Sequence, residues 1–473
     1  MLRSLVTLVR SNIIVSLLGL LQGFVVARFL GPAQYGLLKL LDMIPQLAKY
    51  GDLGFISVVR REIPFYQGAQ DHEKAQLIRN ISYSSEIILS IIISAICFGI
   101  AVYYVPNTVI VVGILSYTLV LLLQKLLKIY KTESVIQRKF KILSRVILFS
   151  GGMSAIGIIS LVPFIGIYAM FTIIPISIFL TLVFARRHIP ITFKFMLAHS
   201  ELTRIIKVGI PLSLATINTG IFQYSKRLTV NHFLGIVYLG YYGIALQLLT
   251  LINSNASFIT RMTQPQIAEY IGEKKFKEAI NLVKYTMGFS LFTLAIIVGF
   301  ALINISWAIE LILPQFSLGI ASYYGLLLCG YITFSQSLMR VLLGAPSVDK
   351  LYQLLLVGFS STITFLGIVY YLDRTNNLTF PNMILAEIAA FSIRWPFLYV
   401  LFIRHFKIKA KEVLELTIVI LLPLIPVGIM FFITQGKEIH TTNILIMNSV
   451  MLLIAGLYYP AIRHYYLKIK KII

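Results

Sequence analysis

Long apolar runs separated by short polar connections are the main pattern of this chain. A helix needs about 20 consecutive, mostly apolar residues to cross the hydrocarbon core of a bilayer. Runs of this length predict about fourteen transmembrane helices and hence an all-α polytopic membrane protein. The predicted spans are residues 11–30, 37–59, 82–105, 108–129, 142–162, 164–184, 207–231, 236–260, 281–304, 318–343, 351–372, 382–403, 413–434 and 442–462.

An internal repeat divides these spans into two groups. One segment has the sequence FLGPAQYG and a later one has FLGIVYLGYYG. Further along, Arg60 lines up with Arg261 and Pro64 with Pro265 at a constant offset. Such self-similarity predicts two six-helix lobes in the same orientation, and parallel repeats are typical of alternating-access carriers with a site between the lobes. The predicted parts are an N-terminal lobe at 1–200, a C-terminal lobe at 201–405 and an additional helix pair at 406–473.

The polar stripe in the second predicted span breaks the apolar pattern. Lys39, Asp42, Gln46 and Lys49 recur at steps of three, four and three, so they share one face of a helix. A charge at the centre of a bilayer costs at least about 2.5–3.5 kcal/mol, so such groups normally face a partner or water. We expect this face to line a hydrated cavity; the alternative is a packing face on which Asp42 neutralises a lysine.

Other polar residues within the spans extend this candidate site. Thr216, Gln223 and Arg227 follow one face of the seventh predicted span, and Gln247 lies in the eighth. Arg394 lies deep in the twelfth, with apolar residues on both sides. The planar donors of a guanidinium can hold two phosphate oxygens at once, and amides and hydroxyls suit sugar hydroxyls. The set therefore favours a phosphorylated, glycan-bearing substrate.

Four further residues qualify this set. Glu387 is the candidate partner of Arg394 within the twelfth span, but seven residues along a helix correspond to about 10 Å, which is too far for a direct ion pair. Additional candidate cations lie nearer the span ends, where snorkelling to the lipid headgroups is the alternative explanation. They are Arg28, Lys226 and Arg340.

The distribution of charge excludes one class of function and predicts the topology. The 473 residues are 58% hydrophobic and 12% charged, with a formal net charge of +23. A basic excess can indicate nucleic-acid binding, but these cations fall mainly in alternate connections, which predicts that those connections and both termini are cytoplasmic. The connections include Arg60, Arg61, Lys74, Arg79, Lys125, Lys128, Lys131, Arg186, Arg187, Lys274, Lys275 and Arg404. We expect a protein of the cell membrane that binds no nucleic acid.

Catalysis is not indicated by the sequence. The histidines are isolated, without the spacing of metal ligands, and no GxxxxGK[ST] motif for ATP is present. Cys97 and Cys329 fall in separate apolar runs, so we expect them to be structural. The predicted external connections are too short for a catalytic domain, which argues against a membrane glycan polymerase or ligase. We expect no enzyme activity, no cofactor and no metal site.

Several segments resemble the Wzx-type flippases of the multidrug/oligosaccharidyl-lipid/polysaccharide exporter (MOP) superfamily. In the first lobe they are ARFLGPAQYGLLKL, YGDLGF and RRE, and in the second VGIPLSLATI, NHFLGIVYLGYYGIA and QPQIAEYIGEKKFKEA. The resemblance implies two six-helix lobes, an extra helix pair and a V-shaped cationic lumen. Members often carry an acidic residue beside the basic one in the seventh helix, whereas this chain has Lys226 and Arg227.

The expected function is alternating-access transport of a polyprenyl-diphosphate-linked oligosaccharide to the outer leaflet, for surface polysaccharide synthesis. Membrane lipid would hold the carrier's tail, and a polysaccharide polymerase and glycosyltransferases would act as partners. A peptidoglycan-precursor flippase and a multidrug antiporter of the same superfamily remain alternatives. The antiporter is disfavoured because cationic drugs need lumenal carboxylates, and Asp42 is flanked by lysines.

Overall fold

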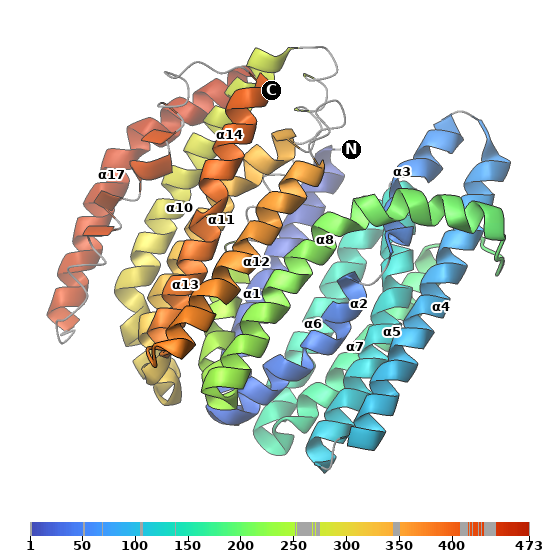
Figure 1. Ribbon diagram of the computed structural model, residues 1–473, viewed down its shortest axis with the longest axis horizontal. Helices are drawn as coiled ribbons and strands as arrows, with labels where there is room; N and C mark the ends of the chain where they lie inside the picture. The colour runs from blue at the N-terminus through green and yellow to red at the C-terminus, as the bar shows by residue number, and fades with distance from the viewer. Residues whose placement is uncertain are drawn as a thin grey trace. The chain divides into compact units, whose positions relative to one another are not determined.

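The computed structural model describes residues 2–250, 275–343, 351–406 and 441–472, with short gaps at 51–52, 69, 105–106 and 138, and scattered positions within 252–270 and 415–429. Throughout these residues every regular element is a helix (Figure 1). Eight of the described helices are long and apolar enough to cross a membrane. The all-α, multi-pass class predicted from the sequence is therefore confirmed.

The chain forms two compact units, Met1–Leu228 (unit 1) and Thr229–Ile473 (unit 2), which are described separately below. The boundary falls inside helix α8. Unit 1 contains α1 (Leu2–Leu41), α2 (Met43–Tyr50), α3 (Phe55–Gly68), α4 (His72–Tyr104), α5 (Thr108–Ile136), α6 (Phe140–Ile165), α7 (Tyr168–His188) and most of α8 (His199–Leu234).

Within unit 1 the helices form a continuous series of neighbours. Helix α1 packs on α6, α6 on α7, α7 on α5, α5 on α4 and α4 on α3. A buried cluster that includes Phe55, Ile63, Ile78 and Ile129 joins α3, α4 and α5, and Ile205 of α8 completes it. The first half of α8 is thereby part of the core of unit 1.

Unit 2 begins with the end of α8 and the helix Ile236–Thr250. It continues with α10 (Phe276–Ile312), the 3₁₀ helix η1 (Pro314–Gly319), α11 (Ile320–Leu343), α12 (Leu351–Arg374), α13 (Phe380–Ser392), α14 (Arg394–Phe406) and α17 (Thr441–Ile472). Helix α10 packs on α11 and α17, and α13 packs on α11 and α12. The side-chain amides of Asn304 and Asn448 donate to each other at 2.9 and 3.0 Å, which ties α17 to α10.

The repeated FLG segments have the same backbone geometry in both units. Gly31 has φ 69° and Gly235 has φ 91°, a left-handed conformation that residues with a Cβ rarely adopt. Gly31 kinks α1, and Gly235 separates α8 from the helix that begins at Ile236. Arg261 and Pro265, the other half of the repeat, lie outside the described residues. The division into six-helix lobes at residues 200 and 405 stays a prediction.

Two predicted spans are broken in the structure. The expected single span 37–59 consists of the end of α1, then α2 and α3, and the span 382–403 consists of α13 and α14. Both breaks precede a proline, Pro45 or Pro396, at the third position of the following helix. Proline has no N–H to donate to the carbonyl four residues earlier, and its ring clashes there, so a continuous helix is disfavoured.

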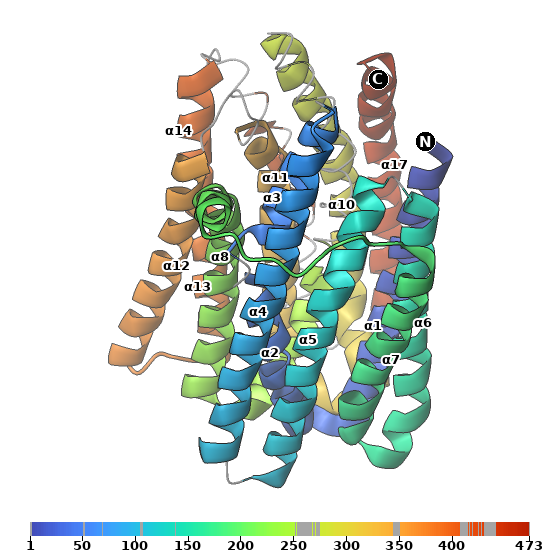
Figure 2. The same ribbon diagram turned by 90° about the vertical axis from the view of Figure 1, so that its right-hand side faces the viewer.

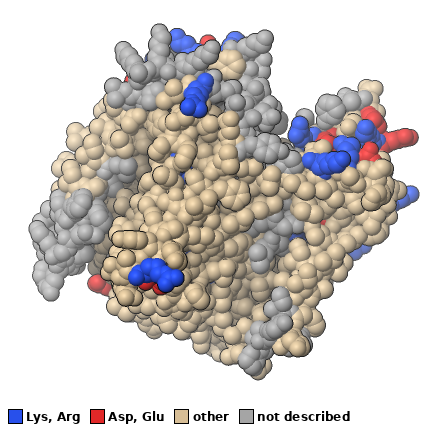
Figure 3. Space-filling model, in the orientation of Figure 1, with Lys and Arg blue, Asp and Glu red and all other residues tan. Residues whose placement is uncertain are grey.

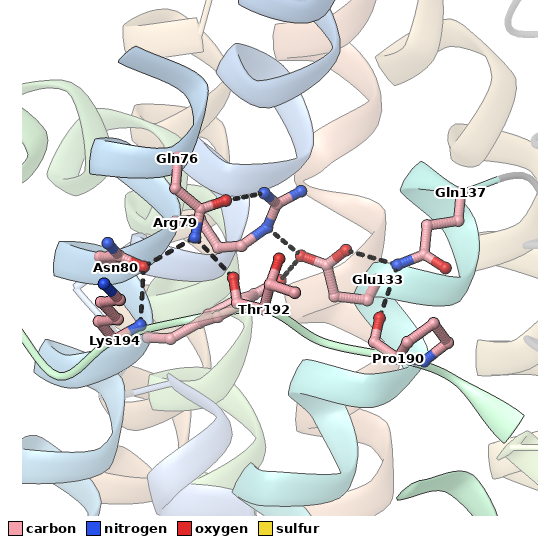
Figure 4. A network of polar contacts seen from close by, with 9 residues as sticks. Gln76, Arg79, Asn80, Glu133, Gln137, Pro190, Thr192 and Lys194 are labelled. Atoms are coloured by element: carbon pink, nitrogen blue, oxygen red, sulfur yellow. Dashed lines mark hydrogen bonds and ion pairs between the residues drawn. The ribbon is translucent and has the colours of Figure 1, made fainter. Parts of the chain in front are cut away.

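An extended segment joins α7 to α8 and crosses the outside of α5 and α4 (Figure 2). Side chains of unit 1 hold its backbone: Gln137 donates to the Pro190 carbonyl at 3.0 Å, and Gln76 donates to the Thr192 carbonyl at 2.6 Å. Asn80 accepts from the Lys194 backbone N–H at 3.0 Å (Figure 4). The predicted boundary at residue 200 therefore directly follows a segment that is fixed to unit 1.

The described surface is largely uncharged. On the face drawn in Figure 3, charged side chains gather in small groups, and broad areas between them carry neither lysine, arginine, aspartate nor glutamate. Large apolar residues such as Leu17, Ile156, Phe179 and Ile363 are exposed. Exposed apolar area of this extent is typical of a surface that faces lipid.

Candidate functional site

The break between α1 and α2 brings the predicted polar stripe into a corner of unit 1. Lys39 lies in the last turn of α1, and its Nζ is 3.7 Å from the Asp42 carboxylate and 4.6 Å from the centre of the Tyr35 ring. Asp42 occupies the break, and Gln46 lies half-buried in α2. The stripe therefore spans two helices instead of one. The side chain of Lys49 lies outside the described residues.

Arg227 of α8 adds a second cation beside this corner. Its guanidinium lies close enough to Lys39 for the two positive charges to repel each other. The Nε and Nη1 atoms of Arg227 are buried and have no hydrogen-bond partner among the described residues. Buried donors without partners are uncommon because their desolvation is not offset. The Arg227 guanidinium is thus a donor set available to a ligand.

The neighbouring candidates of α8 differ from Arg227. The Lys226 side chain is fully buried, with Nζ 4.9 Å from the centre of the Phe222 ring, so it does not snorkel to a surface. Gln223 is half-buried one turn before Arg227. Thr216 lies on the same helix, and its side chain is outside the described residues. Arg28 of α1 is exposed, in agreement with the snorkelling explanation.

A cavity of about 570 Å³ lies within unit 1, next to the α1–α2 break. Asp42, Gln46 and Tyr117 contribute to its wall. Four cations line it as well: Arg60, Lys125, Lys128 and Lys131. The volume is in the range typical of small-molecule sites, about 300–1,000 Å³. Sequence reasoning predicted a hydrated cavity next to Asp42 but did not predict these cations in its wall.

The three cavity lysines correct the sequence interpretation. They were expected in a cytoplasmic connection, whereas the structure places all of them inside α5, which continues to Ile136. The segment KLLKIYK separates them by apolar residues at a spacing of three, which places them along one side of a helix. This spacing was the signal that could have identified them, but the predicted span ended at residue 129.

Two buried ion pairs connect this region to α4. Lys125 Nζ lies 2.6 Å from a carboxylate oxygen of Glu86, and Arg79 Nε lies 2.7 Å from Glu133. Tyr83 also donates to Glu133, at 2.8 Å. The Arg79–Glu133 pair belongs to the network that holds the α7–α8 segment (Figure 4). These pairs fix α4 against α5 and leave the cavity wall well ordered.

Helix α8 is attached to α3 by a third group of charges. Arg204 donates to Glu62 at 3.0 and 3.2 Å and to Glu201 at 2.6 Å. The Glu62 and Glu201 carboxylates raise the pKa of Arg204 above its ordinary value. Close by, a Cβ on Gly209 of α8 would lie 2.5 Å from the Leu53 carbonyl oxygen, so the backbones approach as closely as glycine allows. These contacts position the helix that carries Arg227.

Unit 2 contains a separate pair of arginines. Arg394 begins α14, directly after the break at Ile393, and is 9% exposed. Its Nε donates to the Ser361 hydroxyl of α12, and its guanidinium lies 5.1 Å from the centre of the Phe391 ring. Arg340 of α11 lies close enough to repel it. The structure therefore brings together two arginines that are separated in the sequence.

The remaining candidates of unit 2 have other roles. Glu387, considered as a partner of Arg394, accepts a hydrogen bond from Tyr242 at 2.8 Å. Gln247 is half-buried in the helix Ile236–Thr250. Gln336, in α11, donates to the Phe391 carbonyl at 2.8 Å. Among the residues that the structure describes, no group of three or more histidine, cysteine, aspartate or glutamate side chains could hold a metal ion.

Comparison with known families assigns the chain. A model of the family described as "Polysaccharide biosynthesis protein" matches residues 25–316, more than half of the sequence. The chain belongs to this family. The matched region includes the α1–α2 break, the cavity of unit 1 and Arg227. No curated protein matches the chain.

The fold of this member of the polysaccharide biosynthesis family is that of the MOP superfamily transporters. The solved lipid II flippase MurJ, in an inward closed conformation, has a TM-score of 0.67 and 13% identity, covering 96% of this chain and 98% of that one. An inward-facing multidrug resistance transporter of the MATE family gives 0.62 and 13%, with 89% and 96% covered. The resemblance predicted from the sequence is confirmed at the level of family and fold.

A third similar structure is a MOP superfamily transporter from Pyrococcus furiosus, with a TM-score of 0.57 and 14% identity, covering 88% of this chain and 96% of that one. Its description reports a binding pocket of reversed polarity and suggests a different function. At such identities the likeness shows a shared fold alone. The charges of this chain's own sites must therefore carry any argument about its substrate.

Proposed function

We propose that this chain is a flippase that moves a lipid-diphosphate-linked oligosaccharide from the cytoplasmic to the outer leaflet by alternating access. The supporting observation is that each unit holds two cations within electrostatic reach of each other, Lys39 with Arg227 and Arg340 with Arg394. Like charges in a partly buried site repel, and a bound anion relieves that repulsion. A diphosphate is the anion of the substrate class that the family description favours.

In this mechanism the cations take over the interactions that the diphosphate loses with water. Arg227 supplies buried N–H donors that have no partner among the described residues, and Arg394 supplies a guanidinium fixed by Ser361. Amide side chains of Gln46, Gln223 and Gln247 would meet the sugar hydroxyls. An inside-negative membrane potential favours outward movement of an anion by about 2.3 kcal/mol per charge per 100 mV.

The complete proposed substrate-binding set is the one predicted from the sequence. It consists of Lys39, Asp42, Gln46, Lys49, Thr216, Gln223, Arg227, Gln247 and Arg394, with Arg28, Lys226 and Arg340 as secondary members. A polymerase and glycosyltransferases of surface polysaccharide synthesis are the proposed partners. The MurJ-like fold makes a peptidoglycan precursor the second substrate to test.

The test is glycan export by cells that carry single variants in place of the natural protein, with export normalised to the amount of protein in the membrane. Arg227→Ala should abolish export at normal abundance, and Lys141→Ala, at an exposed lysine of α6, should not. Full export by both Arg227→Ala and Arg394→Ala would refute the proposal. Rescue of a strain lacking its peptidoglycan-precursor flippase would assign the second substrate instead.

The proposed location is the cell membrane with both termini in the cytoplasm. Asn107 precedes α5 on a side predicted to be external, and Lys275 precedes α10 on the predicted cytoplasmic side. In a variant without native cysteines, an impermeant thiol reagent applied to intact cells should modify a cysteine placed at Asn107 and spare one placed at Lys275. The reverse pattern would overturn the topology.

A further inference from the structure

The cavity of unit 1 carries more positive charge than its carboxylates match. Its wall contains Arg60, Lys125, Lys128 and Lys131 but only one carboxylate, that of Asp42. Asp42 already lies 3.7 Å from Lys39, which is not in the wall. The cavity is therefore a basic chamber inside one unit, separate from the arginine pair of unit 2.

The carboxylate of Glu86 does not remove this excess. It pairs with Lys125 at 2.6 Å from α4, which leaves three further cations in the wall. Arg60 donates to the Thr132 hydroxyl at 3.4 Å, a neutral partner. Lys131 is half-buried and has no ion-pair or hydrogen-bond partner among the described residues. An ammonium held partly out of water without a partner is unfavourable unless a ligand or water compensates.

The shape and position of the cavity suit a ligand with a compact anionic group. Lys128 and Lys131 lie one turn apart on α5, while Arg60 approaches from α3, so donors come from two directions. Gln46 and Gln124 add neutral amides, and Ile174 and Ile178 of α7 provide an apolar wall. Phosphate oxygens accept from several cations at once, whereas a cationic or neutral ligand would leave this positive charge uncompensated.

We propose that this cavity binds a phosphate-class anion, and, given the proposed function, that the anion is the diphosphate headgroup of the substrate at its cytoplasmic stage. The inference rests on the proposed function for its choice between a lipid-linked and a free diphosphate. The binding of the anion itself rests on the cavity alone. Lys128 and Lys131 are its principal contacts.

The experiment measures binding to the purified full-length protein in detergent, with inorganic pyrophosphate and with a short-chain isoprenyl diphosphate as probes. Thermal unfolding is followed against probe concentration at constant ionic strength, because salt alone screens surface charges. A ligand that binds the folded state raises Tm in a saturable way. Lys131→Gln and Lys128→Gln should each weaken pyrophosphate binding about tenfold, whereas Lys131→Arg should largely retain it.

The control is Lys141→Gln, which removes the same charge from an exposed position of α6 and should leave binding unchanged. Absence of a saturable Tm rise in the natural protein, or equal binding by the natural protein and Lys131→Gln, would overturn the site. Tighter binding of the isoprenyl diphosphate than of pyrophosphate supports the lipid-linked ligand. Equal affinities contradict that part and assign the cavity to a free anion.

Glycan transport measured on the same variants separates this inference from the proposed function. If the natural protein moves the lipid-linked glycan but Lys131→Gln binds pyrophosphate normally, the function stands and the cavity site is wrong. If pyrophosphate binds in a manner that depends on Lys131 but no lipid-linked glycan is transported, the anion site stands and the proposed function is wrong.

Discussion

Arg227 in unit 1 and Arg394 in unit 2 are both buried or half-buried arginines of the proposed site, yet their surroundings differ. Arg394 donates to Ser361 and lies over Phe391, so its orientation is set by protein contacts. Arg227 has two buried nitrogens without a hydrogen-bond partner among the described residues. The comparison suggests that Arg394 is preorganised by the fold, whereas Arg227 completes its hydrogen bonds only with a ligand.

The largest expected effect separates these two roles. Both Arg227→Ala and Arg394→Ala should abolish glycan export, but Arg227→Ala should keep normal membrane abundance, because no described hydrogen bond is lost. Arg394→Ala should also lower the abundance, since it leaves Ser361 and the Phe391 face without their partner. The measurement is export beside quantitative immunoblotting of membranes. Equal abundance of both variants would remove the distinction.

Lysine replacements sharpen the same comparison. A lysine keeps the charge but loses the planar donor fork, so Arg227→Lys and Arg394→Lys should each retain part of the export. Arg394→Lys should retain less, because its fixed geometry depends on the Nε donor to Ser361. Export by Arg394→Lys at the level of the natural protein would show that charge alone matters there.

A smaller effect is expected from the contact that positions α8. Gly209→Ala should favour the helix by about 1 kcal/mol on propensity alone. However, the new methyl group would lie against the Leu53 carbonyl, and such overpacking costs about 1–3 kcal/mol. We expect a lower Tm and less protein in the membrane.

The matched control is Gly152→Ala in α6, where a Cβ would meet no atom within 4 Å. That variant should be neutral or slightly stabilising. A Gly209→Ala protein with unchanged Tm would indicate that the backbones of α8 and the turn before α3 can move apart. The position of Arg227 would then be less firmly fixed than proposed.

The hydroxyl that holds Arg394 should have a moderate effect. Removing one hydrogen bond to a charged group costs about 1.5–3 kcal/mol, so Ser361→Ala should reduce export by tenfold or more. The control is the neighbouring Ser360→Ala, since Ser360 donates only to the Val357 carbonyl of its own helix. If both variants export equally, Ser361 does not orient Arg394.

The smallest effect is expected at the cysteines. Cys97 is half-buried, and Cys329 is fully buried in α11; both are free. Replacing both by alanine should leave export per molecule unchanged, with at most a small decrease in Tm from the lost volume. Loss of export at normal membrane abundance would give one of them a role outside the proposed site.

The sequence predicts helices best where a local signal marks their ends. The start of α5 at Thr108 was predicted, and its cause is Asn107, whose side chain accepts hydrogen bonds from the N–H groups of Val109 and Ile110. Glycine turns at Gly31 and Gly235 follow from the repeated FLG segment. The break at Asp42 was missed because hydropathy was given more weight than Pro45.

The site is less predictable because it depends on packing between distant segments. Arg227 and Arg394 were identified from isolated charges in apolar runs, but the approach of Arg340 to Arg394 depends on how α11 packs against α14. The cavity lysines were assigned to a connection because a helix can extend beyond the apolar run that predicts it. No pattern within one helix specifies which neighbour its polar face will meet.

The central claim is that the cations of the two units bind a diphosphate. It is tested most directly by translocation in proteoliposomes that contain the purified protein and fluorescent polyprenyl-linked glycans differing only in the linkage. The account predicts rapid movement of the diphosphate-linked glycan, slower movement of the monophosphate-linked one and none of a neutral, ether-linked one. Equal rates for all three would contradict it.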